Sequence, residues 1–542
     1  MPEEAASCEL CGAPASQRCS MCRQAAYCSR QHQKQHWPTH KAGCRCYEVC
    51  TSAELGRHLV ATRDVEAGAA VVSDAPLVVG PRVHRAADEP PACLGCLLPL
   101  PLPPEAAAHA RCPRCLWPLC APCAAAGAPD HAAECRLLRL SAGRAGWLLA
   151  AVTPLRCLLL QKRHPRRWQM LAHMQAHEDR RGPGTDAYSE SGEVSEFMRK
   201  KVLCGEASQA VEDASDAAIR RVCGVLDVNA LDITLPGGGE ASALYPTAYL
   251  LEHSCVPNTR HTFDFQRGCR LTVRAAKLIP RGEHISTMYT HALWGTQARR
   301  EHLRATKYFD CRCPRCADPT ELGTHLSAMR CLGTLTESDA PACGGIQLPT
   351  SPLDPASDWR CDRCPVSLPA AHVAELVSRL GDEVDKTQQE RPTVESLETL
   401  LEKLDTFLHP HHYHSYSVKH SLLQLYGQQR GYAMDQLSDQ QLARKEALCR
   451  ELLLTTNCLD PGYARLALYT GVLLHELSRS LLESARRSAG DRSALEQLLE
   501  ARALLAAAQR ALQPEPPGSA GERMLQLVRG AQHEVEARVK EA

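Results

Sequence analysis

The pattern of apolar and polar residues divides the chain into a β-rich first part and a helical last part. Two runs rich in β-branched residues, "HLVAT" at 58–62 and "AVVSDAPLVV" at 70–79, flank the turn residues "DVEAG" and predict a β-hairpin. Leucines recur at helical spacing from residue 137 to about 201, and again through most of 369–542. The pattern therefore predicts a multidomain α+β chain that ends in several antiparallel helices.

Shorter patterns add four local predictions. The polar stretch 176–193 indicates an exposed loop. Helical periodicity runs into Asn229, where an asparagine usually serves as a cap, and a β-like run ending in three glycines follows. Ser438 and Gln441 have the spacing of a capping box. The histidine-rich "HPHHYHSYS" at 409–417 is interpreted as the loop before a helix, with metal binding as the alternative.

Length and charge limit the class of protein. A chain of 542 residues is too long for one ordinary core, so about three or four domains are expected. The formal net charge is zero, which excludes a global attraction to nucleic acid or anionic membrane but leaves a local basic patch for nucleic acid open. The first ten residues, "MPEEAASCEL", lack a secretory leader, and no run of about 18 apolar residues follows. We therefore expect a soluble, non-secreted protein of the nucleus, the cytoplasm or both.

The 29 cysteines are clustered, which in a reducing compartment indicates metal sites, with zinc as the leading expectation. The first cluster, 8–44, contains two CxxC pairs, then a Cys-x₃-His pair and a His-x₃-Cys pair. Such pairs supply soft ligands at tetrahedral positions, and eight ligands suffice for two zinc ions. A disulfide or reactive-thiol cluster is the alternative, which the absence of a secretory leader disfavours.

The first cluster resembles the MYND finger, including "YCS" at 27–29 and "HWPTHK" at 36–41. In that family the ligand pairs interleave. The resemblance implies one zinc on Cys8, Cys11, Cys28 and His32, and a second on Cys19, Cys22, His40 and Cys44. His32 replaces the usual cysteine, and imidazole is a competent zinc ligand.

A second cluster repeats this order of ligand pairs and predicts an internal copy of a two-zinc finger. Its ligands are Cys93, Cys96, Cys112, Cys115, Cys120, Cys123, His131 and Cys135. A further zinc site is predicted from the "WRCDRC" knuckle and two widely spaced cysteines, giving the set Cys331, Cys343, Cys361 and Cys364.

Five motifs outside the fingers resemble the SET methyltransferase core of the SMYD family. The segment 307–331, which contains the last of these motifs, resembles the arthropod SmydA branch of that family. The five motifs are "ELGRHLVAT" (54–62), "VLDVNALDI" (225–233), "YLLEHSCVPN" (249–258), "GEHISTMY" (282–289) and "FDCRCPRC" (309–316). The resemblance covers residues 8 to about 320. It implies an α+β multidomain fold: a β-rich SET core with zinc-stabilised MYND fingers, a post-SET zinc site and an all-α TPR-like C-terminal domain. It also places the family's inserted finger at 93–135, so that the first finger is an extra copy.

The expected domains follow from these segments. They are an N-terminal MYND finger (1–48), the first SET part (49–92), a second finger inserted in SET (93–136), a helical insert (137–236), the SET C-terminal core (237–310), post-SET and a further zinc site (311–368), and a helical TPR-like domain (369–542).

The resemblance also implies the active site. Tyr289 matches the catalytic tyrosine, which orients the amine and the methyl group. The cofactor, S-adenosylmethionine, would contact Gly56, Arg57, His58, Asn229, Glu252, His253 and Phe309. A post-SET zinc would be held by Cys255, Cys311, Cys313 and Cys316, with a simple buried thiol as the alternative for Cys255. About six zinc ions are expected in all, and cysteines such as Cys46 and Cys50 have no assigned role.

Three residues depart from the family pattern at this site. Glu252 stands in place of an asparagine, His58 in place of a glycine, and Lys307 in place of a tyrosine that lines the target-lysine channel. Because buried opposite charges need partners, we hypothesise that Glu252 and Lys307 form an ion pair.

Two functions follow from these observations. The first is a protein-lysine methyltransferase that acts on a histone or another protein and takes part in transcription regulation. The second is a catalytically silent SET/MYND adaptor whose fingers bind proline-rich peptides. A monomer without membrane contacts is expected in either case.

Overall fold

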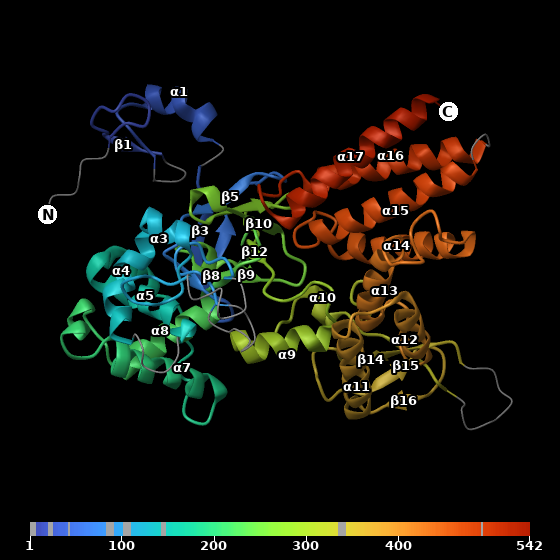
Figure 1. The fold of residues 1–542 in the computed structure, drawn as a ribbon, viewed down its shortest axis with the longest axis horizontal. Coiled ribbons are helices and arrows are strands. Elements are labelled where there is room, and N and C mark those ends of the chain that lie inside the picture. The colour runs from blue at the N-terminus through green and yellow to red at the C-terminus, as the bar shows by residue number, and fades with distance from the viewer. Residues whose placement is uncertain are drawn as a thin grey trace.

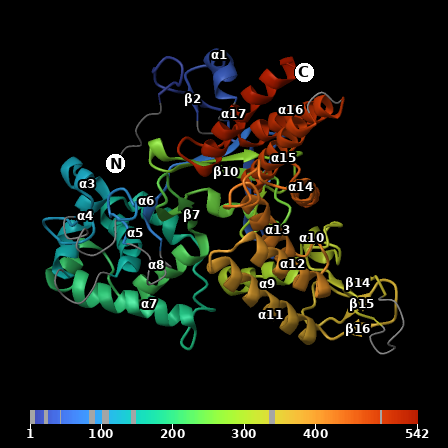
Figure 2. The ribbon, with the colours of Figure 1, turned by 45° about the vertical axis from the view of Figure 1, so that its right-hand side comes forward.

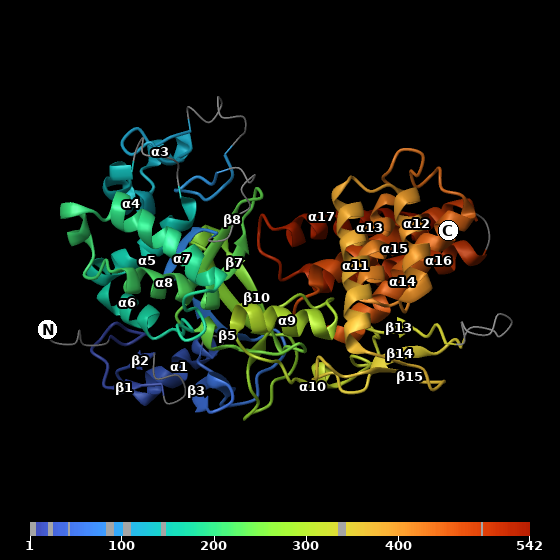
Figure 3. The same cartoon turned by 90° about the horizontal axis from the view of Figure 1, so that it is seen from below.

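The computed structural model describes residues 7–19, 25–41, 44–82, 91–100, 110–141, 148–333, 343–488 and 492–541. Figure 1 shows small β-sheets at the centre, with a separate N-terminal unit above them. Seen from below in Figure 3, the sheets lie between the helices of 129–229 on one side and those of 370–541 on the other. The predicted α+β multidomain fold with a helical C-terminal region is confirmed.

The N-terminal unit is a finger built from three short elements. They are β1 (Gln17–Arg18), β2 (Ala26–Tyr27) and α1 (Arg30–His40). Strand β1 pairs antiparallel with β2, and Ser29 caps α1 by accepting from the backbone N–H of His32. Its small core contains Tyr27, Cys8, Cys19 and Cys44. So few apolar side chains give little stability on their own, which is consistent with a unit stabilised by bound metal.

The central β region contains three small sheets that share one core. One is β3 (Tyr47–Ser52) with β4 (Gly56–Ala61); the second is β10 (Thr259–Asp264), β11 (Arg270–Ala275) and β5 (Ala70–Asp74); the third is β6 (Val78–Pro81), β8 (Glu240–Leu244) and β7 (Leu231–Thr234). Leu59, Val72, Tyr245 and Leu271 lie in that core.

The hairpin predicted from residues 58–79 is wrong. Strand β4 pairs with β3, and β5 pairs with β11, so the two runs lie in different sheets. Val65, in the intervening turn, instead bridges to Ile279. The turn residues therefore connect two sheets, because β4 forms its hairpin with the preceding β3, and β5 has a long-range partner that local sequence does not reveal.

Helices cover one side of the sheets. They are α3 (Ala121–Ala126), α4 (Pro129–Leu138), α5 (Val152–Arg163), α6 (Pro165–Ala172), α7 (Asp186–Phe197) and α8 (Asp216–Asn229). The loop predicted at 176–193 is wrong in its second half, because Thr185 accepts from the N–H of Tyr188 and caps α7. Helix α8 ends at Asn229 as predicted, and β7 follows.

Residues 296–368 join the sheets to the C-terminal helices. They contain α9 (Thr296–Lys307), α10 (Pro314–Ala317) and a four-stranded sheet of β13 (Met329–Arg330), β14 (Ile346–Pro349), β15 (Trp359–Cys361) and β16 (Ser367–Leu368). Cys255, Met288 and Leu303 share one core with leucines of the C-terminal helices such as Leu473 and Leu505. The helical domain therefore supports one wall of the SET core.

The C-terminal region is helical, as predicted (Figure 2). Its helices are α11 (Ala370–Gln389), α12 (Val394–Phe407), α13 (Tyr413–Leu425), α14 (Asp439–Leu459), α15 (Ala467–Arg487), α16 (Arg492–Leu512) and α17 (Ala520–Glu541). Ser438 and Gln441 form the expected capping box. Of the histidine-rich stretch, residues 409–412 precede α13 with His412 as its cap, whereas residues 413–417 already belong to the helix. Within the described residues, no helix is both long and apolar enough to cross a membrane.

Candidate active site and zinc centres

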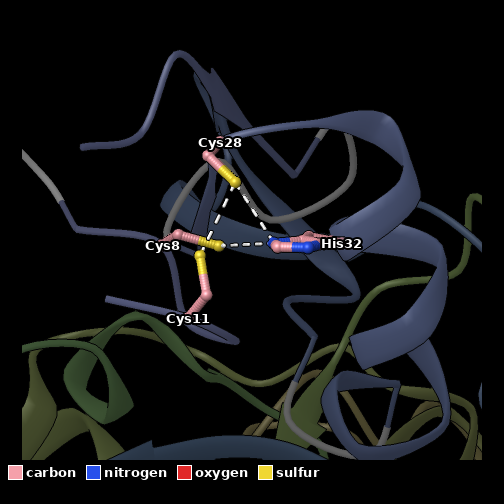
Figure 4. A group of neighbouring side chains, drawn as sticks. All are labelled: Cys8, Cys11, Cys28 and His32. Carbon is pink, nitrogen blue, oxygen red and sulfur yellow. Dashed lines mark hydrogen bonds between the residues drawn. The ribbon is translucent and has the colours of Figure 1, made fainter. Parts of the chain in front are cut away.

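The first finger brings the predicted ligands of one zinc together. Figure 4 shows Cys8, Cys11, Cys28 and His32 converging, with Cys11 Sγ 3.7 Å from Cys28 Sγ and Cys28 Sγ 3.1 Å from His32 Nδ1. Two thiolates bound tetrahedrally at about 2.3 Å from zinc lie about 3.8 Å apart. The separation of the sulfur atoms thus fits one tetrahedral zinc.

The second predicted zinc of this finger is described only in part. Cys19 Sγ and Cys44 Sγ are 3.8 Å apart, which again fits a shared ion. His40 lies at the end of α1, with its ring in edge contact with Trp37. Cys22 lies outside the described residues.

The second finger repeats the interleaved arrangement. Its ligand atoms form two groups, each within 4.8 Å: Cys93, Cys96, Cys120 and Cys123, and Cys112, Cys115, His131 and Cys135. The first and third ligand pairs along the sequence thus form one group, and the second and fourth pairs form the other. This is the interleaved order expected for the first finger. The prediction of an internal repeat with two metal-binding groups is consistent with this geometry.

A buried ion pair that the sequence did not predict fixes the second finger to the rest of the molecule. Glu134 lies three residues after His131, whose Nδ1 is 3.5 Å from Glu134 Oε1. Arg156 of α5 donates two hydrogen bonds of 2.8 Å to Glu134 and others to the carbonyl oxygens of Val79 and Leu94. A carboxylate behind a ligating imidazole orients the ring toward the metal.

The post-SET ligands also meet as expected. Cys255, Cys311, Cys313 and Cys316 lie within 4.8 Å of one another, with Cys255 Sγ 3.9 Å from Cys311 Sγ and 3.5 Å from Cys316 Sγ. Arg299 of α9 donates from Nε to Cys255 Sγ at 3.2 Å. Arg299 is fully buried and also pairs with the buried Glu321 at 2.7 Å, so its guanidinium links this carboxylate to the thiolates of the proposed zinc site.

The last predicted set is similarly compact. Cys331 Sγ is 3.5 Å from Cys364 Sγ, and Cys343 Sγ is 3.7 Å from Cys361 Sγ. The pairing of β14 with β15 aligns these ligands despite the wide spacing of Cys331 and Cys343 in sequence.

The predicted catalytic and adenine-packing residues lie together beside the post-SET cysteines. The ring of His253 lies 5.3 Å from the ring of Tyr289 and 5.8 Å from that of Phe309. The Tyr289 hydroxyl donates to the carbonyl oxygen of Leu251. Burial, with the carboxylate of Glu252, raises the pKa of Tyr289 above its ordinary value, so the phenol stays protonated and neutral.

The other predicted cofactor residues are more dispersed. Gly56 has a φ of +64°, a conformation that favours glycine, at the start of β4. Arg57 donates to the carbonyl oxygen of His173, in the segment after α6. Asn229 donates from Nδ2 to the carbonyl oxygens of Gln175 and Val225 at 2.7 and 2.8 Å, which leaves its Oδ1 as a free acceptor within the described contacts.

The expected ion pair between Glu252 and Lys307 is wrong. Glu252 Oε2 lies 2.9 Å from Nδ1 of His284, and the ring of His284 lies 4.7 Å from that of His58. Lys307 donates to the carbonyl oxygens of Asp227 and Val228 at 3.1 and 2.8 Å. Carbonyl groups at a helix C-terminus attract cations, so α8 supplies the lysine's partner.

Tyr308 and Arg181, which the sequence did not predict as site residues, lie beside Lys307 and the end of α8. Tyr308 has a φ of +61°, and its hydroxyl accepts from Arg181 at 3.2 Å. Arg181 also pairs with Asp227 of α8. The sequence did contain a signal for Tyr308. The resemblance places the family's tyrosine at position 307, and Tyr308 is the next residue along the chain.

Two family models match the chain. The MYND finger model matches residues 8–44, and the SET domain model matches residues 56–290. The second finger lies inside the SET match.

The chain is also similar to several curated proteins. It is 32% identical to SET domain-containing protein SmydA-8, isoform B, of Drosophila melanogaster, over 61% of this chain and 69% of that protein. Over shorter stretches it is 37% identical to the human N-lysine methyltransferase SMYD2, across 14% of this chain and 17% of that protein. It is 31% identical to the mouse histone-lysine N-methyltransferase SMYD3, across 22% of this chain and 26% of that protein. The chain therefore belongs to the SMYD family of SET and MYND domain proteins.

Proposed function

We propose that the chain is a protein-lysine methyltransferase that uses S-adenosylmethionine. The observation that carries this proposal is the meeting of His253, Tyr289 and Phe309, three aromatic residues from separate segments, beside the post-SET cysteines. The names of related proteins such as SMYD2 and SMYD3 support the same reaction.

The residues at this point fit a methyl transfer. The cofactor supplies the methyl group, and the protein must align a neutral amine with it. The Tyr289 hydroxyl donates its proton to Leu251 O, so the orientation of its lone pairs is fixed and the oxygen can accept from the target amine. Phe309 and the free Oδ1 of Asn229 are the groups proposed to hold the cofactor's adenine end, and His253 a further contact.

The charges of Glu252 and Lys307 are each balanced by a different partner, which favours a pocket that can still bind cofactor and substrate. Glu252 is paired with His284, and Lys307 is held at the end of α8. Neither charge is left buried without a partner, so neither departure from the family pattern has to destroy the site. We further propose about six structural zinc ions, a protein substrate, and a nuclear or cytoplasmic location. Binding of proline-rich peptides by the fingers and a role in transcription remain part of this proposal.

Calorimetric titration with S-adenosylmethionine tests the cofactor. Saturable binding at one site per chain is expected, and Phe309→Ala should weaken it at least tenfold because aromatic packing on the adenine is lost. A matched control is Phe265→Ala, since Phe265 lies in a short turn after β10. No binding by the zinc-replete chain would instead support the silent adaptor.

A further inference from the structure

The three residues His58, His284 and Glu252 form one cluster drawn from three separate segments. His58 lies on β4, Glu252 on β9 (Glu252–His253), and His284 precedes β12 (Ser286–Thr287), which pairs parallel with β9. His284 also bridges Val60 of β4. The cluster is therefore held by backbone pairing on both sides, as a preorganised site requires.

The hydrogen bonds of the two imidazoles determine which ring nitrogen is available. Nδ1 of His58 is 3.0 Å from the carbonyl oxygen of Gly56, and Nδ1 of His284 is 2.9 Å from the carboxylate of Glu252. Both oxygen atoms are acceptors, so each Nδ1 carries the proton, and the Nε2 atom of each neutral ring keeps its lone pair. Metal-binding histidines have this arrangement: one ring nitrogen donates to a carbonyl or carboxylate and the other binds the ion.

The spacing of the rings fits a shared ion. Two imidazoles bound at about 2.1 Å from one metal have centroids about 4.5 Å apart at a right angle and about 5.2 Å apart at the tetrahedral angle. The centroids of His58 and His284 are 4.7 Å apart. Cys50 is the residue of β3 directly opposite His58, so its side chain projects from the same face.

We propose that His58 and His284 bind a divalent transition-metal ion through their Nε2 atoms, with Cys50 as a third ligand and Glu252 orienting His284. This site is distinct from the structural zinc groups of the fingers and the post-SET segment. Imidazole ligands suit zinc, nickel and copper. With only these protein ligands, the remaining coordination positions of the ion are available to water. His284 is 45% exposed, so an ion can reach it from solvent.

Nickel titration of the zinc-replete full-length chain tests this site, with bound nickel and released zinc both measured. The chain should take up one Ni²⁺ without an equivalent release of zinc. The double variant His58→Gln with His284→Gln should lose that uptake, because glutamine keeps an N–H donor for the same oxygen but has no imidazole lone pair. Glu252→Gln should weaken binding about tenfold or more, and Cys50→Ser should weaken it as well.

His372→Gln is the matched control, since His372 is exposed on α11, and it should bind nickel as the unaltered chain does. Zinc content and the melting temperature of each variant exclude simple misfolding. Equal nickel uptake by the double variant, no uptake by the unaltered chain, or uptake matched by zinc release would each overturn the proposal. The titration contains neither cofactor nor substrate, so its result is independent of the proposed methyltransferase activity.

Discussion

Tyr289 and His253 are joined by a hydrogen bond, in which the backbone N–H of Tyr289 donates to Nδ1 of His253 at 3.0 Å. Because Nδ1 accepts, Nε2 of His253 carries the proton, and it lies 3.3 Å from Cys255 Sγ. A continuous set of contacts therefore links the post-SET thiolates to the proposed catalytic tyrosine. The zinc proposed there would hold two distant segments of the chain together and would also fix the position of the active-site residues.

Removal of one post-SET ligand should consequently affect both metal and cofactor binding. We expect Cys255→Ser to contain one zinc fewer per chain and to bind S-adenosylmethionine at least tenfold more weakly, because structural zinc is coupled to folding. Elemental analysis and calorimetry give the two values. Cys458→Ser is the control, since Cys458 is exposed and lies outside the zinc sets predicted from the sequence. A full zinc content in Cys255→Ser would contradict the assignment.

The buried pair of Glu134 and Arg156 should be important for stability. Glu134→Gln leaves the Arg156 charge without its carboxylate, which typically costs about 3 to 5 kcal/mol in the free energy of unfolding. Glu240→Gln, in the partly exposed pair with Arg82, should cost about 1 kcal/mol or less. Urea unfolding measures both values, and equal costs would show that the buried pair has no special role.

The corrected partners of Glu252 and Lys307 can be tested by double-mutant cycles. Glu252→Gln and Lys307→Met should be additive to within about 0.5 kcal/mol, because these residues do not share a contact. Glu252→Gln and His284→Gln should instead show an interaction energy above that value. Unfolding free energies provide the data. Strong coupling between Glu252 and Lys307 would restore the original ion-pair hypothesis.

Partly buried histidines in and before α13 should make stability depend on pH. Burial lowers the pKa of His409, His414 and His420 from an ordinary value of 6.5 to about 4 each. The unfolded chain therefore binds more protons between these values, so stability is retained above pH 6.5 and falls as the pH drops toward 4. The loss at pH 5 should be on the order of 1 to 2 kcal/mol for each residue.

Comparing unfolding at pH 7 and pH 5 measures this effect. His420→Gln should reduce the pH dependence, whereas His372→Gln, at an exposed position, should leave it unchanged. An identical free energy of unfolding at both pH values would show that these histidines do not stay neutral in the fold.

The sequence predicts the metal-binding groups better than the contacts between distant segments. Ligand spacing in the fingers is local, so pairs such as Cys93 and Cys96 could be recognised directly, and the resemblance supplied the distant Cys255. The pairing of β5 with β11 joins segments about 200 residues apart, and nothing in the local pattern indicates it. Glu252 was assigned to Lys307 by charge and by the zinc expected to join their segments, because the sequence does not show that His284 lies nearer.

Methyl transfer by the zinc-replete chain and by Tyr289→Phe tests the proposed reaction most directly. Labelled S-adenosylmethionine and a mixture of nuclear and cytoplasmic proteins serve as reactants, and label on lysine is measured in a single turnover. We expect transfer by the unaltered chain and a rate at least tenfold lower for Tyr289→Phe with nearly unchanged cofactor affinity, since only the aligning hydroxyl is removed. Label on lysine at equal rates for both chains, or no label with either chain despite bound cofactor, would contradict the proposal.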